Sequence, residues 1–192
     1  MANPIDVNAI LAHTRCWIGR VVVELNLCPF ARKPYESEKV RYVVSAANQT
    51  QDLLADMQRE LEQLRACEAS AVETTVLIHP RVLNDFLDYN DFLAEVDSAI
   101  HTWGYEGEFQ VASFHPHYQF AGTEVEGAGN YTNRSPYPML HLLREASLTR
   151  AIDSYARPDK IPERNIRTLE KIGAARMQET LDDCLRIEDE KK

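Results

Sequence analysis

Three short segments rich in β-branched and aromatic residues alternate with two long amphipathic segments between residues 40 and 114. Residues 40–46, 74–78 and 109–114 have the composition of strands. The stretch after the first strand carries apolar residues at helical spacing, and residues 85–103 do the same. Strands that alternate with full-length helices form parallel sheets through right-handed crossovers. The sequence therefore predicts an α/β fold with a small, mainly parallel β-α-β-α-β core.

Further segments on either side of this core are predicted to cover it with helices. Apolar residues from Ile10 to Leu25 recur every three or four positions, and this first helix ends before Pro29. Two more helices are predicted at residues 138–155 and 163–186. Residues 32–37, between the first helix and the first strand, are predicted to be a loop.

The length of 192 residues favours a single domain, predicted at residues 1–186, with a charged tail at 187–192. No apolar run approaches the ~18–20 residues of a membrane span, and the N-terminus has no export-signal pattern. Four cysteines without a Cys-x-x-Cys pair are typical of reduced thiols. These features predict a cytoplasmic protein that does not enter a membrane.

The formal net charge of −9 is unevenly distributed along the chain. Residues 45–108 hold three Lys or Arg against thirteen Asp or Glu, which disfavours binding to nucleic acid because phosphates would be repelled. Residues 134–157 are an exception, with four Arg against two acidic residues. This pattern predicts a small anionic ligand rather than a polyanion.

Two predicted strands end with the same dipeptide, His79-Pro80 and His115-Pro116. In a parallel sheet both histidines would lie at the carboxyl edge, where open α/β sheets bind their ligands. Their separation would be ~4.8 Å on neighbouring strands, or ~10 Å with one strand between them. A strand-ending proline would explain either dipeptide alone, but the repetition favours a functional pair.

His117 extends this group, because residues two apart in an extended segment face the same side. Two imidazoles on one side suit a divalent transition metal or a proton-transfer pair, and the sequence leaves both alternatives open. A complete metal site needs three or four ligands. Besides His115 and His117, the candidate ligands are His79, Cys28, and the pair His141 and Glu145, which would share one face of the predicted helix.

Residues 104–138 hold five of the seven glycines together with several aromatic residues, which is typical of a packed functional loop. Candidate substrate-binding residues in this loop and beyond it are Tyr118, Asn130, Asn133, Arg134 and Arg144. Pro138 would begin a helix whose free N–H groups attract an anion, and Arg134 beside it could clamp a carboxylate or phosphate. Capping and turn formation are the alternative roles.

Cys28 is predicted at the C-terminal end of the first helix. A nucleophilic thiolate needs a lowered pKa, which a helix C-terminus does not provide, so the position favours a structural role unless a histidine reaches it. Cys16, Cys67 and Cys184 lie on or beside apolar helical stripes and are predicted to be packing residues.

Three motifs together resemble a known family. They are residues 26–31 (NLCPFA), 114–122 (FHPHYQFAG) and 130–138 (NYTNRSPYP). The chain is similar over most of its length to a largely bacterial family catalogued as domain of unknown function 1415. The resemblance implies a cytosolic, single-domain protein and assigns no activity. It also draws attention to Cys28, because that residue lies in one of the three motifs.

Two functions are consistent with these features. The first is an enzyme acting on a small anionic metabolite by hydrolysis or group transfer, with His79, His115, His117 and Cys28 as catalytic candidates and a metal as a further option. The second is a non-catalytic protein that binds a metal, an anion or a partner. No nucleotide-cofactor motif is present, so nicotinamide or flavin chemistry through such a motif is not supported.

Overall fold

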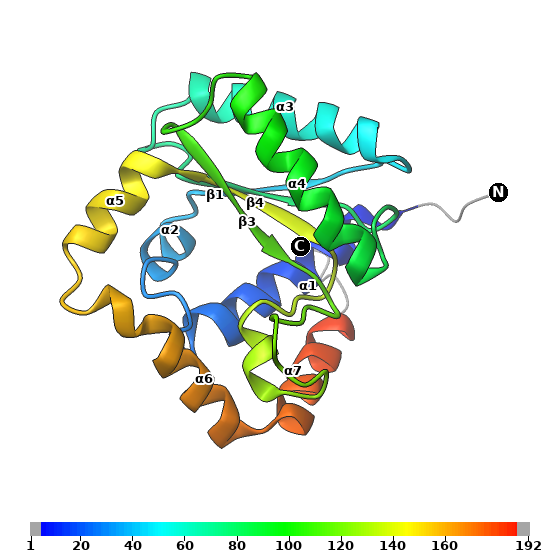
Figure 1. Cartoon of the computed structure of the whole chain (residues 1–192), viewed down its shortest axis with the longest axis vertical. Helices are drawn as coiled ribbons and strands as arrows, with labels where there is room; N and C mark the ends of the chain where they lie inside the picture. The colour runs from blue at the N-terminus through cyan, green and yellow to red at the C-terminus, as the bar shows by residue number, and fades with distance from the viewer. Residues whose placement is uncertain (1–4, 188–192) are drawn as a thin grey trace.

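The computed structural model describes residues 5–187 (Figure 1). The elements in chain order are α1 (Val7–Trp17), the π-helix η1 (Ile18–Val23), α2 (Arg32–Glu36), β1 (Val40–Val44), α3 (Thr50–Ala66), β2 (Thr74–Ile78), α4 (Phe86–Thr102), β3 (Phe109–Phe114), the 3-10 helix η2 (Ala128–Thr132), β4 (Met139–Arg144), α5 (Glu145–Asp153), the 3-10 helix η3 (Pro158–Lys160), α6 (Ile161–Ile172) and α7 (Ala174–Leu185). The predicted tail lies outside the described residues except for Ile187.

The four strands form one mixed sheet in the order β1-β2-β4-β3. β1 and β2 are parallel, and β4 is antiparallel to both β2 and β3. The α/β fold class is therefore confirmed, but the prediction of a mainly parallel sheet is wrong. The reason is β4, which inserts between the two strands that were expected to belong to a parallel core.

β4 also corrects the prediction of a helix over residues 138–155. Leu140 and Leu142 are fully buried on one face of the sheet, while His141 and Leu143 lie on the other face. This alternation is the period of a strand, and pairing on both sides satisfies the backbone of residues 139–144. The helix α5 begins only at Glu145, so His141 and Glu145 do not share a helix face.

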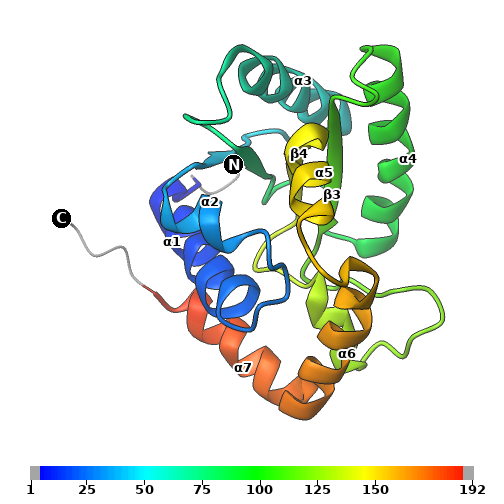
Figure 2. The same cartoon turned by 90° about the vertical axis from the view of Figure 1, so that its left-hand side faces the viewer.

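Helices α3 and α4 cover one face of the sheet, as Figure 2 shows from the side. Their apolar stripes pack on the strand residues that point to this face, which include Leu77, Leu140 and Leu142. The two helices bury large side chains completely, among them Leu53 and Tyr89. Helices α3 and α4 therefore shield the strand residues at the centre of this face from solvent.

The opposite face is covered less evenly. α1 and η1 pack across β1, and α7 and α6 pack on α1 and η2 (Figures 1 and 2). The predicted helix over residues 163–186 is divided at Gly173, whose φ of 86° ends α6 and begins α7. Residues 32–36 form the short helix α2 rather than the predicted loop. Within residues 5–187, no helix is long and apolar enough to cross a membrane.

Candidate functional site

The structure places His79 and His115 at the same edge of the sheet, after the parallel strands β2 and β3, with β4 between them. Tyr89 of α4 fills the gap between the two imidazoles. Its ring centroid lies 5.8 Å from that of His79 and 5.1 Å from that of His115. The Tyr89 hydroxyl donates to Met139 O and accepts from Phe114 N, so this tyrosine joins β4 to β3.

The ring nitrogens of the two histidines are largely engaged by the protein. His79 Nδ1 donates to Val82 O at 3.0 Å, and His115 Nε2 donates to Leu83 O at 3.2 Å, because a carbonyl can only accept. His115 Nδ1 accepts from the backbone N–H of His117, which occupies its second nitrogen. Burial lowers the pKa of both imidazoles to about 4, so both are neutral at pH 7.

His117 is exposed, and its ring centroid lies 5.9 Å from that of His115. Within the described residues, no three His, Cys, Asp or Glu side chains are grouped in a way that could hold a metal ion. The candidate ligands fall into separate places instead. His79, His115 and His117 lie at the sheet edge, Cys28 and His141 line a cavity on the open sheet face, and Glu145 begins α5.

Asn130 holds the glycine-rich loop together from inside. It is fully buried, its Oδ1 accepts from Phe120 N and from the Thr123 hydroxyl, and its Nδ2 donates to two loop carbonyls. All the hydrogen-bonding positions of this amide are therefore used within the loop. Tyr118, another predicted substrate residue, packs between Phe86 and Phe120 with its ring tilted against both.

Arg134 is also buried within the loop, where it is 7% exposed. Its guanidinium donates to Tyr118 O and Val125 O and lies 4.8 Å from the ring centre of Tyr131. Asn133 donates from Nδ2 to Ser113 O at the end of β3. The helix predicted to start at Pro138 is replaced by β4, so the predicted anion site at a helix N-terminus is absent there.

Arg144 lies at the end of β4, and its guanidinium donates to backbone carbonyls on the side of the sheet that α3 covers. Its partners are Leu64 O and Cys67 O, at the C-terminal end of α3, and Val72 O in the loop that follows. These carbonyls lie where the negative end of the helix dipole favours a cation. Arg144 therefore ties α3 to the sheet, and it is also one of the residues that line the cavity.

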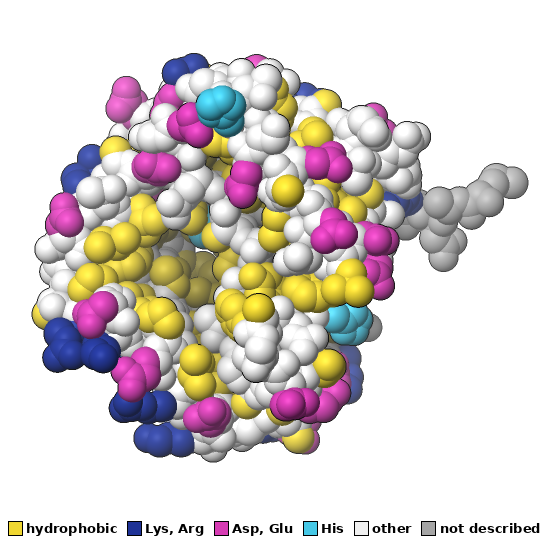
Figure 3. Space-filling model, in the orientation of Figure 1, with side chains coloured by type: hydrophobic (Ala, Val, Ile, Leu, Met, Phe, Trp, Pro, Cys, Tyr) yellow, Lys and Arg dark blue, Asp and Glu magenta, His cyan; other side chains and the backbone are white. Residues whose placement is uncertain are grey.

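A concavity of functional size lies on the sheet face opposite α3 and α4. We call it the sheet-face cavity. Its volume is about 620 Å³, within the range of small-molecule sites. Figure 3 shows a hollow lined by hydrophobic side chains between α5 and the sheet. Its main walls come from η1, α2 and α5, together with Cys28, Pro29 and Phe30, and its apolar lining includes Trp17, Ile18, Val22, Phe30, Val40, Val76, Phe114, Met139, Leu143 and Leu148.

The floor of the sheet-face cavity consists of strand residues that a helix would normally cover. On β4, which has strands on both sides, His141 and Leu143 remain partly accessible while Leu140 and Leu142 are fully buried. The π-helical turn of η1 contributes Ile18 and Val22 to a wall. Such turns are frequent at functional sites. The core packing therefore leaves His141 and Leu143 of the central strand partly accessible on this face.

His141 is held in one tautomer by its neighbours. The Thr74 hydroxyl lies 2.6 Å from Leu142 O and 2.7 Å from His141 Nε2. The single hydroxyl proton must point to the carbonyl, so His141 Nε2 donates to the Thr74 oxygen. Nδ1 is then a free lone pair with no hydrogen-bond partner among the described residues. Burial lowers the pKa of His141 to about 4, and the ring is neutral.

Cys28 lies in the turn between η1 and α2, not at a helix C-terminus as predicted. The backbone N–H groups of Phe30 and Ala31 and the guanidinium of Arg164 are close enough to the sulfur to lower the pKa of the thiol. These three groups favour the thiolate. Burial has the larger effect and raises the pKa of the thiol above its ordinary value. Cys28 is therefore a neutral thiol at pH 7.

Cations surround this apolar space, although the chain as a whole is acidic. Lys33, Lys39 and Arg150 line the cavity, and Glu73 is the one acidic residue among its lining side chains. Within residues 5–187 the two lysines form no ion pair, while Arg150 donates to the hydroxyl of Ser147. The indole Nε1–H of Trp17, which also lines the cavity, is buried without a partner in the described structure.

The sequence-predicted residues thus divide between two places, and most of the cavity was missed. Lys33 lies in the predicted loop, and Arg150 lies in the predicted helix over residues 138–155. Lys39 lies just before the predicted strand at residues 40–46. One signal was available for His141. It stands between two leucines in the run Met-Leu-His-Leu-Leu-Arg, and strand alternation would have placed it on the face opposite Leu140 and Leu142.

Comparison with known proteins identifies one relationship. A family described as "Protein of unknown function (DUF1415)" matches residues 9–179, which is most of the chain. No curated protein and no solved structure matches the chain. The family match spans both the sheet-edge histidines and the sheet-face cavity, and its description assigns a role to neither.

Proposed function

We propose that this chain, which belongs to the DUF1415 family of proteins of unknown function, is an enzyme that acts on a small organic anion in the sheet-face cavity. The observation that carries the proposal is the cavity itself. Its floor is apolar, its volume is about 620 Å³, and Lys33, Lys39 and Arg150 line it. A carboxylate with an apolar body fits both features. The free thiols support the cytoplasm as the compartment.

This proposal keeps the small anionic substrate that the charge pattern predicts and moves the site away from the sheet edge. Both ring nitrogens of His115 form hydrogen bonds with backbone groups, and Asn130 and Arg134 donate hydrogen bonds to carbonyls of the loop. His115 and Asn130 have no free donor for a ligand unless a bond that holds the fold breaks, and Arg134 uses two of its N–H groups within the loop. Lys33 and Lys39, in contrast, make no such bond among the described residues.

Cys28 and His141 would supply the chemistry. In acyl transfer the Cys28 sulfur attacks the substrate's carbonyl carbon, the leaving group departs with the thiol proton, and water then hydrolyses the thioester. Two backbone N–H groups and Arg164 favour the thiolate as it forms. His141 Nδ1 is a neutral nitrogen available to accept a proton or a hydrogen bond in the same cavity.

A second candidate function is binding without turnover. The specific observation in its favour is that burial raises the pKa of Cys28, so the resting thiol is a weak nucleophile. In that case the same anion would be held by the same cations, and Cys28 would only line the cavity wall.

Binding is tested by calorimetry and thermal unfolding with octanoate and with octanol, which has the same chain length without the charge. We expect saturating octanoate to raise Tm by several degrees and octanol to do much less. Lys33→Gln should weaken octanoate binding by roughly 3- to 10-fold, because one ion contact is lost. Lys171→Gln, on α6 outside the cavity, is the matched control and should bind octanoate normally.

Equal effects of octanoate and octanol, or equal losses in the two lysine variants, would contradict anion binding in the cavity. Turnover is tested separately with the mono-para-nitrophenyl ester of octanedioic acid, which keeps one free carboxylate. Release of nitrophenol by the wild type and by Cys67→Ser, but not by Cys28→Ser, supports the enzyme. Binding of octanoate without ester cleavage in any form of the protein supports the second candidate.

A further inference from the structure

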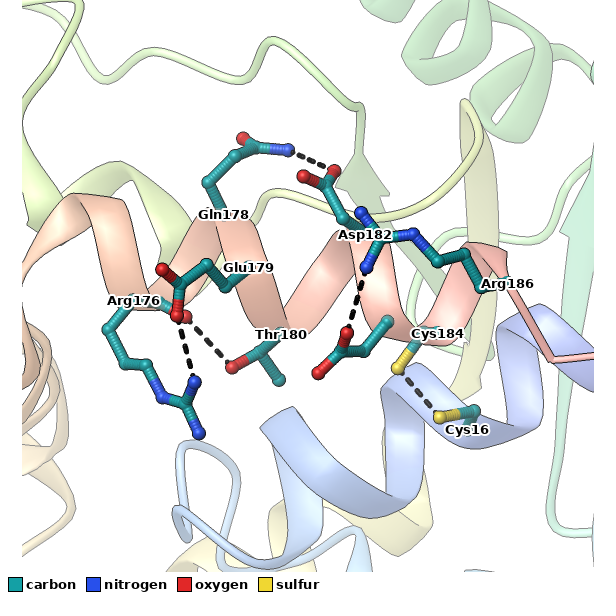
Figure 4. Close-up of polar contacts among 9 residues, drawn as sticks. Cys16, Arg176, Gln178, Glu179, Thr180, Asp182, Cys184 and Arg186 are labelled. Atoms are coloured by element: carbon teal, nitrogen blue, oxygen red, sulfur yellow. Dashed lines mark hydrogen bonds and ion pairs between the residues drawn. The ribbon is translucent and has the colours of Figure 1, made fainter.

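Two cysteines from opposite ends of the chain face each other at the contact between α1 and α7. Cys16 Sγ lies 2.7 Å from Cys184 Sγ, and Figure 4 shows the two thiols pointing toward each other across the helices. This distance is shorter than unbonded sulfur atoms normally keep, and it approaches the ~2.05 Å of a disulfide. Only a small movement of the two side chains separates the present contact from a covalent bond.

The other two cysteines are not part of this contact. Cys28 lies in the sheet-face cavity, and Cys67 is exposed after the end of α3. Cys184 is fully buried and Cys16 is partly exposed. The packing role predicted for Cys16 and Cys184 explains their burial, since both lie where α1 meets α7. A packing role alone does not explain why both residues at this contact are cysteines with their sulfur atoms facing each other.

We propose that Cys16 and Cys184 form a reversible disulfide that links α1 to α7 when the protein meets a low-molecular-weight disulfide such as oxidised glutathione. The Cys16 thiolate attacks one sulfur of glutathione disulfide and releases one reduced glutathione. Cys184 then attacks Cys16 Sγ, loses its proton to water and displaces the second glutathione. Two protein thiols are oxidised, and one glutathione disulfide is reduced to two thiols.

The order of the two steps follows from exposure. Cys16 can be reached from solvent, whereas Cys184 is enclosed by the helices. Burial and the adjacent Cys16 raise the pKa of Cys184 to about 12, so this thiol does not start the exchange. Once Cys16 carries the glutathione, Cys184 is already within contact of the sulfur that it must attack.

The disulfide would close a loop that includes nearly the whole fold, because the two residues are 168 positions apart. A long closed loop restricts the unfolded chain strongly, which stabilises the folded protein. The bond would also fix the end of α1 next to Trp17 and Ile18, which line the sheet-face cavity. The inference does not depend on what that cavity binds.

The test equilibrates the full-length wild-type protein with glutathione buffers from fully reduced to fully oxidised. Free thiols are then alkylated in denaturant, and the protein is digested without reduction. We expect a cross-linked peptide pair containing Cys16 and Cys184 that disappears on reduction. Oxidation should raise Tm by roughly 5 to 15 °C. Complete alkylation of both residues after oxidation, or a bridge that uses Cys28 or Cys67 instead, would overturn the proposal.

Variants separate the bond from general effects of oxidation. Cys67→Ser should keep both the cross-link and the rise in Tm, because Cys67 lies outside the contact. Cys16→Ser should lose both. Cys184→Ala provides the same comparison where Cys16→Ser does not fold. A rise in Tm on oxidation that persists in a folded Cys16 or Cys184 variant contradicts the assignment.

Discussion

His141 donates from Nε2 to the Thr74 hydroxyl at 2.7 Å, and that hydroxyl donates to Leu142 O at 2.6 Å. This short chain of hydrogen bonds links β2 to β4 and determines which nitrogen of His141 is free in the sheet-face cavity. The next residue, Thr75, lies on the opposite face of the sheet, and its buried hydroxyl has no partner within the described structure. The two adjacent threonines therefore provide a natural comparison.

Thr74→Val should destabilise the protein by about 1 to 3 kcal/mol, because the buried N–H of His141 loses its acceptor. Thr75→Val is the matched control and should be neutral or slightly stabilising, since its hydroxyl makes no bond to lose. Urea unfolding of both variants measures the difference. Equal costs at the two positions would refute the hydrogen-bond chain and the tautomer that follows from it.

Stability should decrease as the pH falls from about 6.5 toward 4. Burial lowers the pKa of His79, His115 and His141 to about 4 in the folded protein, against 6.5 in the unfolded chain. In this window only the unfolded chain binds those protons, so acid favours unfolding, and above pH 6.5 the effect is absent. For fully buried His79 alone, the free energy of unfolding should fall by ~3 kcal/mol across this pH window.

NMR of the imidazole protons checks this pH dependence directly. The signals of His79, His115 and His141 should stay constant between pH 8 and about pH 5.5, while urea unfolding shows the falling stability. Titration of any of the three near pH 6.5 in the folded protein would contradict the burial argument for that residue.

Asn130→Ala should cost about 2 to 4 kcal/mol, because the loop loses an amide that satisfies four backbone or hydroxyl groups. Asn48→Ala, which removes an exposed amide with one bond to Ala46 O, should change stability by less than about 0.5 kcal/mol. Urea unfolding compares the two variants. If Asn130 binds a ligand instead, its loss should impair ligand binding and leave stability near that of Asn48→Ala.

The burial of Cys28 predicts a slow thiol. Iodoacetamide at pH 7.5 should alkylate exposed Cys67 faster than Cys28, because burial raises the pKa of Cys28 and limits access. Octanoate should slow the modification of Cys28 further without affecting Cys67, which lies outside the cavity. Mass spectrometry of timed samples measures both rates. Faster modification of Cys28 would mean that its thiolate is already stabilised in the empty cavity.

Much of the fold could be predicted from the sequence because several elements carry their own periodic pattern. β2, β3, α3 and α4 form where apolar spacing indicates them. β4 could not be predicted in the same way, because residues 139–144 run directly into α5 and the combined apolar stretch resembles one helix. Its strand conformation depends on pairing with β2 and β3, which are far away in the sequence.

The candidate site was predictable only in part. Two His-Pro strand ends correctly place His79 and His115 at one edge, but the carbonyls of Val82 and Leu83 decide which nitrogens are engaged, and no spacing rule locates those carbonyls. The sheet-face cavity depends on an absence of packing, because within residues 5–187 no helix packs directly on the floor around His141. Its cations come from α2, α5 and the residue before β1, which only the fold brings together.

The most direct test of the account is a crystal structure with para-bromophenylacetate, located by the anomalous signal of its bromine. The account predicts one bromine position on the apolar floor beside His141 and Phe114, with the carboxylate toward Lys33, Lys39 or Arg150. Three results would contradict the proposed site. The bromine could lie in the basic groove beside α6, between Arg157 and Lys171, or at the sheet-edge histidines, or no bromine could be found at a saturating concentration.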